Sequence, residues 1–366
     1  MQPAGTKLNF YLIGLIMIAI FSVKALTTLP IPLEYLIMEN IDLERWYRPK
    51  IDKTEFRKLC EKSDWQGFKH MIIFFLSLLI SGYLAFVTWG SWWCILFFII
   101  YGNIYCSVDA IWHETGHKTA FKSKFWNEFF YQIASYMNNF EPVRWRWSHF
   151  KHHTFTAFTK DPFDFEIAIT KPTDVIYFFS LFIPFTNIFY LHKSLQFETL
   201  KHALGITTDV MKVCIPEKER DKCRNSARIH VGIWIVTAVV SLNVNSWLPL
   251  IYIVLPVFYG NTHRVMCGLT QHTGLHDDIK DHRYSTRTVI LNPISSFLYW
   301  QMEYHIEHHV FPIVPSYNLP KLHELIKDQL PPPKKGFIDE YKEIIPAILK
   351  QAKNPEYKID VKLTNR

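Results

Sequence analysis

Two uninterrupted apolar runs constrain the fold of this chain more than any other feature. Residues 71–89 (MIIFFLSLLISGYLAFVTW) and 91–108 (SWWCILFFIIYGNIYCSV) contain no charged side chain. A transmembrane helix needs about 20 apolar residues to cross a bilayer core of about 30 Å. With Gly90 as the turn between them, the runs predict a helical hairpin with membrane spans at 71–89 and 91–110.

Three further apolar segments are shorter or interrupted. Residues 228–243 and 246–260 are joined by the turn sequence NVNS and predict a second hairpin. Residues 8–26 could add an N-terminal span. The segment 174–191 contains Pro184, which removes a helical hydrogen bond and kinks or ends a helix.

The basic residues indicate the orientation of the spans. Residues 45–69 and 193–228 each carry eight Lys or Arg, and such segments remain on the cytoplasmic side. A crossing at 174–191 would place the second segment outside, so an interfacial helix is expected there. We therefore expect an all-α integral membrane protein with one domain over 1–366. It should have a four-span bundle and a cytosolic tail at 331–366, in a bacterial inner membrane or the endoplasmic reticulum.

Histidine is the residue type that indicates function. The chain has 17 histidines and six cysteines, and the cysteines form no CxxC pair, which gives no case for a disulfide scaffold or a zinc ribbon. Ten histidines fall in short clusters close to the predicted hairpins: HETGH (113–117), HFKHH (149–153), QHTGLH (271–276) and HIEHH (305–309). Positions three and four apart share one face of a helix, so each cluster can direct its imidazoles at one point.

The number of imidazoles limits the kind of metal site. A catalytic zinc uses three protein ligands and a structural zinc four, so eight or nine imidazoles suit two metal ions. Nitrogen donors suit iron, copper, nickel or zinc. One alternative is a membrane zinc metallopeptidase, because HETGH matches H-E-x-x-H, but this leaves the other clusters unexplained. A metal transporter is the other alternative, although residues 71–108 offer no ionisable group except Tyr and Cys.

The three clusters HETGH, HFKHH and HIEHH, separated by membrane hairpins, resemble the histidine boxes of the membrane fatty acid desaturase and hydroxylase superfamily. The resemblance extends from about residue 107 to 323 and is strongest over 286–323. It implies a four-span bundle with a cytosolic helical cap, two non-haem iron ions and oxygen-dependent attack on an unactivated C–H bond. The ligands that it implies are His113, His117, His149, His152, His153, His305, His308 and His309, with His272 as a ninth ligand and His276 as a possible extra one.

The resemblance also implies the substrate and the partners. A fatty acyl lipid or acyl thioester would gain a double bond, and hydroxylation of a lipid or hydrocarbon chain at the same site is the alternative. No His-Pro-Gly-Gly haem motif occurs in the 366 residues of the sequence. Electrons are therefore expected from a separate carrier of the cytochrome b5 or ferredoxin type. No feature indicates a nucleic-acid partner.

Ligand histidines usually donate a hydrogen bond from the N–H of their second ring nitrogen to a carboxylate or carbonyl. Asp109, one helical turn before His113, is the first candidate for this role. Asp161, Asp164 and Glu303 lie near the other boxes and are further candidates.

Overall fold

The computed structural model describes residues 46–161, 163–166 and 175–363, and nearly all of its regular structure is helical. The N-terminal span predicted at 8–26 lies outside the described residues. The predicted all-helical class is therefore confirmed for the part of the chain that the structure describes.

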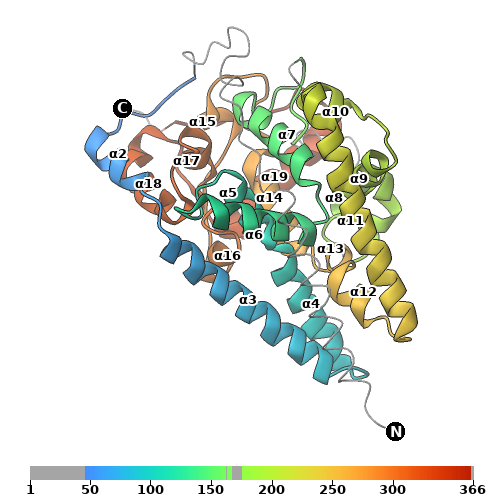
Figure 1. The fold of residues 1–366 in the computed structure, drawn as a ribbon. Coiled ribbons are helices and arrows are strands. Elements are labelled where there is room, and N and C mark those ends of the chain that lie inside the picture. Colours follow the sequence, from blue (N-terminus) through green and yellow to red (C-terminus); the bar gives the residue numbers. More distant parts are fainter. Residues whose placement is uncertain (1–45, 162, 167–174, 364–366) are drawn as a thin grey trace.

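Three helices in the described residues are long and apolar enough to cross a membrane: α3 (Asp64–Val87), the continuous segment Trp92–Gly116, and α11 (Glu217–Asn243). The second of these consists of α4 (Trp92–Cys106) and α5 (Val108–Gly116), which follow one another across Ser107. Gly90, with a φ of 87°, forms the turn between α3 and α4, as the sequence predicted. Figure 1 shows α3, α4 and α11 extending from one side of the molecule, whereas α7, α10 and α15 lie on the other side.

The surface of α3 is what a lipid environment requires. Leu79 is 68% exposed and Ile80 60% exposed, and Leu76 and Tyr83 on the same helix are also exposed. Soluble proteins rarely expose contiguous apolar patches larger than a few hundred Å². The three apolar helices therefore indicate a membrane protein.

The predicted span at 246–260 is not a single helix. The structure has two short helices there, α12 (Leu248–Ile253) and α13 (Pro256–Tyr259). Pro256 explains the break, because proline has no N–H to donate and its ring clashes with the preceding turn. Three long apolar helices are thus found in the described residues, and the predicted count of four spans stays a prediction.

Hydrogen bonds from α4 satisfy the carbonyl groups that this break leaves free. The Tyr101 hydroxyl donates to the Tyr252 carbonyl over 3.0 Å, and the Tyr105 hydroxyl donates to the Ile253 carbonyl over 2.9 Å. Unpaired backbone groups are costly at membrane depth, so a broken helix is tolerated where neighbouring helices supply partners.

A pair of glycines allows α4 to approach the segment after α13 closely. A Cβ on Gly260 would lie 2.0 Å from the backbone carbon of Gly102. No side chain fits at that distance, so both positions require glycine for the chain to pack this way.

The interfacial helix predicted at 174–191 is also divided. The structure has α8 (Val175–Ser180) and the 3₁₀ helix η3 (Thr186–Lys193), with Pro184 between them. Phe185 adopts a positive φ of 66° at the start of η3. The proline that the sequence analysis noted therefore interrupts the helix.

The remaining elements position the histidine clusters and cover them. They are α2 (Lys53–Leu59), α6 (Lys124–Met137), α7 (Pro142–Thr154), α9 (Leu195–Ala203), α10 (Asp209–Cys214), α14 (Thr262–His272), α15 (His282–Ser285), α16 (Pro293–Leu298), α17 (His305–Val310), η4 (Ser316–Asn318), α18 (Leu319–Ile326), η5 (Lys327–Gln329) and α19 (Gly336–Gln351). Two short strands, β1 (Val289–Ile290) and β2 (Lys334–Lys335), pair in parallel. The predicted tail at 331–366 thus includes β2 and α19, and α19 buries Ile344 and Ile348.

Candidate metal centre

Four helices carry the clustered histidines. The C-terminal end of α5 carries His113, and His117 caps that helix. The last two turns of α7 carry His149, His152 and His153. His272 ends α14, and the six-residue α17 carries His305, His308 and His309. The spacing of three and four residues places the members of each box on adjoining faces of their helix.

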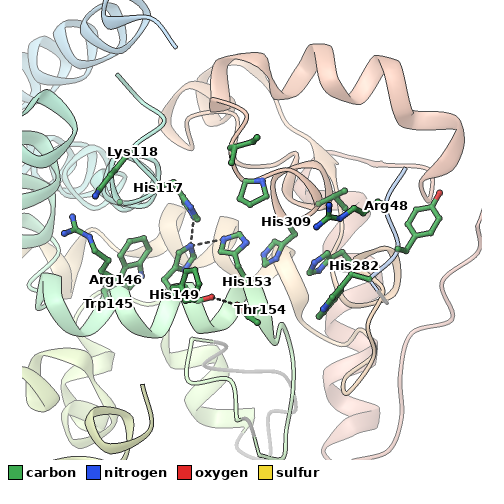
Figure 2. Close-up of a pocket in the computed structure, with 17 residues that line it drawn as sticks. Arg48, His117, Lys118, Trp145, Arg146, His149, His153, Thr154, His282 and His309 are labelled. Atoms are coloured by element: carbon green, nitrogen blue, oxygen red, sulfur yellow. Dashed lines mark hydrogen bonds between the residues drawn. The ribbon is translucent and has the colours of Figure 1, made fainter. Parts of the chain in front are cut away.

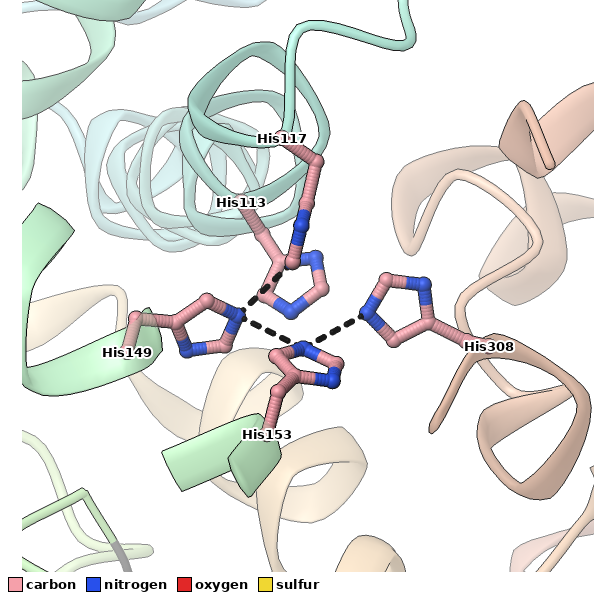
Figure 3. A group of neighbouring side chains, drawn as sticks. All are labelled: His113, His117, His149, His153 and His308. Atoms are coloured by element: carbon pink, nitrogen blue, oxygen red, sulfur yellow. Dashed lines mark hydrogen bonds between the residues drawn. The ribbon is translucent and has the colours of Figure 1, made fainter. Parts of the chain in front are cut away.

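The structure brings five of these side chains together in what we call the five-histidine group: His113, His117, His149, His153 and His308. Their ligand atoms all lie within 4.8 Å of one another. The Nε2 atoms of His117 and His149 are 2.9 Å apart, and those of His153 and His308 are 3.2 Å apart. Figure 3 shows the five rings converging from α5, α7 and α17 on one small volume.

The other four form the four-histidine group: His152, His272, His305 and His309. The Nε2 atoms of His272 and His305 are 3.1 Å apart, as are those of His305 and His309. Since α7 and α17 each supply members to both groups, the two groups are adjacent. The rings of His153 and His309, one from each group, have centroids only 4.4 Å apart.

These separations match nitrogen ligands that share a metal ion. Two nitrogens at about 2.1 Å from one metal lie about 3.0–3.4 Å apart at ordinary coordination angles. Both ring nitrogens of His113 are buried without a hydrogen-bond partner in the described residues, and such groups are rarely left unpaired unless something else binds them. The donor set is thus suited to two metal ions.

The site keeps most of these imidazoles neutral. Burial, reinforced by neighbouring imidazoles, lowers the pKa of His149, His305 and His308 well below the ordinary value. Burial also lowers the pKa of His272 to about 3. A neutral imidazole has the free electron pair that a metal ion requires.

The second ring nitrogens of several group members have partners that orient the rings. Nδ1 of His152 lies 2.8 Å from a carboxylate oxygen of Asp164, and Nδ1 of His272 lies 2.8 Å from the Ser285 carbonyl. If each Nδ1 carries the proton, Nε2 presents its electron pair to the group. Burial disfavours the charged form of His152, but Asp164 outweighs this effect and raises its pKa.

The other predicted carboxylates lie elsewhere. Asp109 accepts a hydrogen bond from Asn138 over 3.3 Å, and His113 has no bond to it. Asp161 is exposed. Glu303 is buried, which raises its pKa to about 7, and none of its hydrogen bonds reaches a group member within the described residues. These three expectations are therefore corrected.

Two contacts were missed at the sequence level. The Thr156 hydroxyl lies 3.2 Å from Nδ1 of His309, and a carboxylate oxygen of Glu166 lies 4.0 Å from Nδ1 of His149. Glu166 follows Asp164 by two residues, so its closeness in sequence to a predicted partner of a ligand histidine could have identified it. A backbone carbonyl such as that of Ser285 has no signature in the sequence.

Two other histidines have unexpected positions. His276 lies outside both groups, and its ring packs near Tyr284 with centroids 5.7 Å apart. His282, which resembled an isolated histidine in the sequence, is buried with its ring centroid 5.0 Å from that of His309. It also stacks on Trp46 at 4.3 Å.

The glutamates within the first and third boxes, Glu114 and Glu307, have hydrogen-bond partners outside the histidine groups. Glu114 is fully buried and accepts a hydrogen bond from the backbone N–H of Ser316 over 3.0 Å. Glu307 is bonded to His323 and accepts from the Thr288 hydroxyl over 2.6 Å. In a zinc metallopeptidase the glutamate of H-E-x-x-H acts as a general base beside the metal, and the position of Glu114 does not suit that role.

Two cavities of about 340 Å³ each reach the groups. The first is lined by members of both groups and by three cations, Arg48, Lys118 and Arg146. Figure 2 shows Lys118 and Arg146 on one side of the histidines and Arg48 on the other. The second cavity is lined by histidines of both groups and extends along α14, with apolar walls that include Trp112, Phe140 and Leu269.

The comparisons with known proteins agree with this geometry. The family model for fatty acid desaturase matches residues 88–341, which contain all nine grouped histidines. No curated protein matches the chain. Since the family model covers more than half of the sequence and the grouped histidines fit its histidine boxes, the chain belongs to the fatty acid desaturase family.

Proposed function

We propose that this protein is an oxygen-dependent oxidoreductase that introduces a double bond into a fatty acyl chain. Two iron ions would be held by the two groups, one by the five-histidine group and one by the four-histidine group. The observation that supports this proposal is the convergence of nine imidazoles on two adjacent points with nitrogen separations of about 3 Å.

Iron ions with open coordination positions would provide the chemistry for binding and reducing molecular oxygen. The residues of the chain do the positioning. Asp164 and the Ser285 carbonyl fix the rings of His152 and His272, and Trp145 stacks on His149 with centroids 4.2 Å apart. Near-complete burial of the four-histidine group excludes bulk water, which protects a reactive centre from side reactions.

The cavity along α14 is the proposed place for the substrate chain. It reaches both groups, and its walls include aromatic and aliphatic side chains that exclude water. A hydrocarbon chain there would present one methylene to the metal site. The same geometry serves hydroxylation, so the product distinguishes the two reactions.

The other cavity is the proposed entry for electrons from a separate carrier. Arg48, Lys118 and Arg146 line it, and opposite charges on a partner speed its encounter with such a surface. We expect an acidic protein of the cytochrome b5 or ferredoxin type to dock there. The basic segments 45–69 and 193–228 support a cytoplasmic location for this face, within a single domain over 1–366.

Lipid analysis of a host that expresses the chain tests this proposal. The wild-type protein should produce lipids that have lost two hydrogens, and these should be absent with His152→Ala. His276→Ala is the matched control, because His276 belongs to one of the histidine clusters of the sequence but lies outside both groups. Products that gain one oxygen instead would favour hydroxylation. The same new lipids from His152→Ala as from the control would contradict the proposal.

A further inference from the structure

The lining of the cavity along α14 includes charged side chains, which is unusual for a cavity that holds only hydrocarbon. Arg264, Gly268 and His272 are four residues apart and share one face of α14, and all three line the cavity. At 1.5 Å per residue, Arg264 lies about 12 Å along the helix from His272. A Cβ on Gly268 would meet no atom of the described residues within 4 Å, so these residues leave the cavity open between Arg264 and His272.

Arg264 has unused hydrogen-bonding capacity toward this cavity. A guanidinium group has five N–H donors and stays protonated. Among the described residues, its one hydrogen bond is a 3.5 Å contact from Nη1 to the Asn138 side-chain oxygen, and no carboxylate oxygen lies within 4 Å of it. Its charged group also lies 5.3 Å from the centre of the Phe140 ring. An unsubstituted hydrocarbon chain in the cavity would displace water from the remaining donors without pairing them, which is unfavourable.

Asp109 lines the same cavity and balances the charge. Asn138 joins the two residues, because its side-chain N–H donates to Asp109 while its oxygen accepts from Arg264. In the described residues the Asp109 carboxylate has no other hydrogen bond. Arg264 and Asp109 together therefore offer donors and acceptors with no net charge, and a group that can both accept and donate matches this pair better than an anion.

We propose that the substrate carries a neutral hydroxyl group, which accepts a hydrogen bond from Arg264 and donates one to Asp109. This inference rests on the proposed function and narrows its substrate to hydroxyl-bearing hydrocarbon chains. Arg264 is then a residue that determines specificity. The hydroxyl group and the carbon that reacts would lie at opposite ends of the face formed by Arg264, Gly268 and His272.

Equilibrium binding of radiolabelled dodecanol, dodecane and dodecanoate to the full-length, iron-loaded protein in nanodiscs tests the inference, with binding to empty nanodiscs subtracted. Dodecanol should bind about tenfold more tightly than dodecane, the effect of one hydrogen bond to a charged group. Equal binding of dodecanol and dodecane to the wild-type protein would overturn the inference. Tighter binding of dodecanoate than of dodecanol would also overturn it, because the site would then select an anion.

Three variants assign the preference to Arg264. Arg264→Met should bring the ratio of dodecanol to dodecane affinity close to one, and Arg264→Lys should give an intermediate ratio. Arg228→Met is the matched control, because Arg228 lies on α11 and its guanidinium donates to the Ala203 carbonyl; it should keep the wild-type ratio. If Arg264→Met does not fold, comparison of Arg264→Lys with the wild-type protein still tests the assignment of the preference to Arg264. An unchanged ratio in Arg264→Lys would then overturn the assignment.

Binding and turnover separate this inference from the proposed function. If no lipid is converted in the presence of oxygen but dodecanol still binds more tightly than dodecane, only the proposed function is rejected. Conversion of methyl-ended chains together with equal binding of dodecanol and dodecane would reject the inference alone.

Discussion

Replacing Asp164 by asparagine should weaken metal binding at the four-histidine group without disturbing the fold broadly. One carboxylate oxygen of Asp164 lies 2.8 Å from Nδ1 of His152 and accepts from the Ala157 N–H over 2.9 Å. The other oxygen accepts from the Glu166 N–H over 2.9 Å. Every hydrogen bond that the Asp164 carboxylate makes here is with a donor.

Asparagine cannot satisfy this arrangement in either orientation of its amide. Its NH₂ group must face either the Glu166 N–H or the pair formed by His152 and the Ala157 N–H, and two donors then oppose each other. Loss of such a partner of a ligand histidine typically lowers metal affinity 10–100-fold, which corresponds to about 1.4–2.8 kcal/mol. At limiting iron we expect the content of the purified protein to fall from about two ions per chain toward one.

Iron analysis by mass spectrometry after equilibration with an iron buffer measures this change. Asp161→Asn is the control, because Asp161 is exposed and only three residues away. Turnover should fall with the iron content in Asp164→Asn and stay at the wild-type value in Asp161→Asn. Equal iron content and equal turnover in the two variants would refute the role assigned to Asp164.

Two further changes test the account at other points. Glu114→Gln should keep iron and turnover within several-fold of wild type, because glutamine can still accept the Ser316 N–H; oxygen-dependent turnover measures this, and a loss of about 10³-fold or more with iron retained would indicate a chemical role for Glu114. Gly260→Ala should lower the thermal midpoint of the detergent-solubilised protein, since its Cβ would lie 2.0 Å from the Gly102 backbone. Such overpacking lowers the free energy of unfolding by about 1–3 kcal/mol or more. Gly232→Ala on α11, where a Cβ meets no atom within 4 Å, should leave that midpoint unchanged or raise it, and equal midpoints for the two alanine variants would argue against close contact at Gly260.

The features that could be predicted from the sequence are those that depend on local periodicity. Uncharged runs of about 20 residues predicted α3 and the α4–α5 segment, because length and hydropathy are local properties. The spacing of three and four residues predicted that each box would present its rings together. The groups in the structure contain every histidine of the three boxes, together with His272.

The features that could not be predicted depend on long-range contacts. Asp109 lies on the same helical face as His113, but Asn138, far along the chain, takes its hydrogen bond. His282 lies between boxes and reaches the four-histidine group only through the folded chain. The division of 246–260 also depends on tertiary packing, because the tyrosines of α4 supply the donors that make a break at Pro256 tolerable.

Metal analysis combined with X-ray absorption spectroscopy of the purified wild-type protein tests the central claim most directly. The account predicts about two iron ions per chain, with nitrogen atoms at about 2.1 Å as the dominant ligands and no sulfur ligand. His308→Ala, which removes one member of the five-histidine group, should lower the iron content. A single tightly bound zinc ion per chain, or two irons held mainly by oxygen or sulfur, would contradict the account.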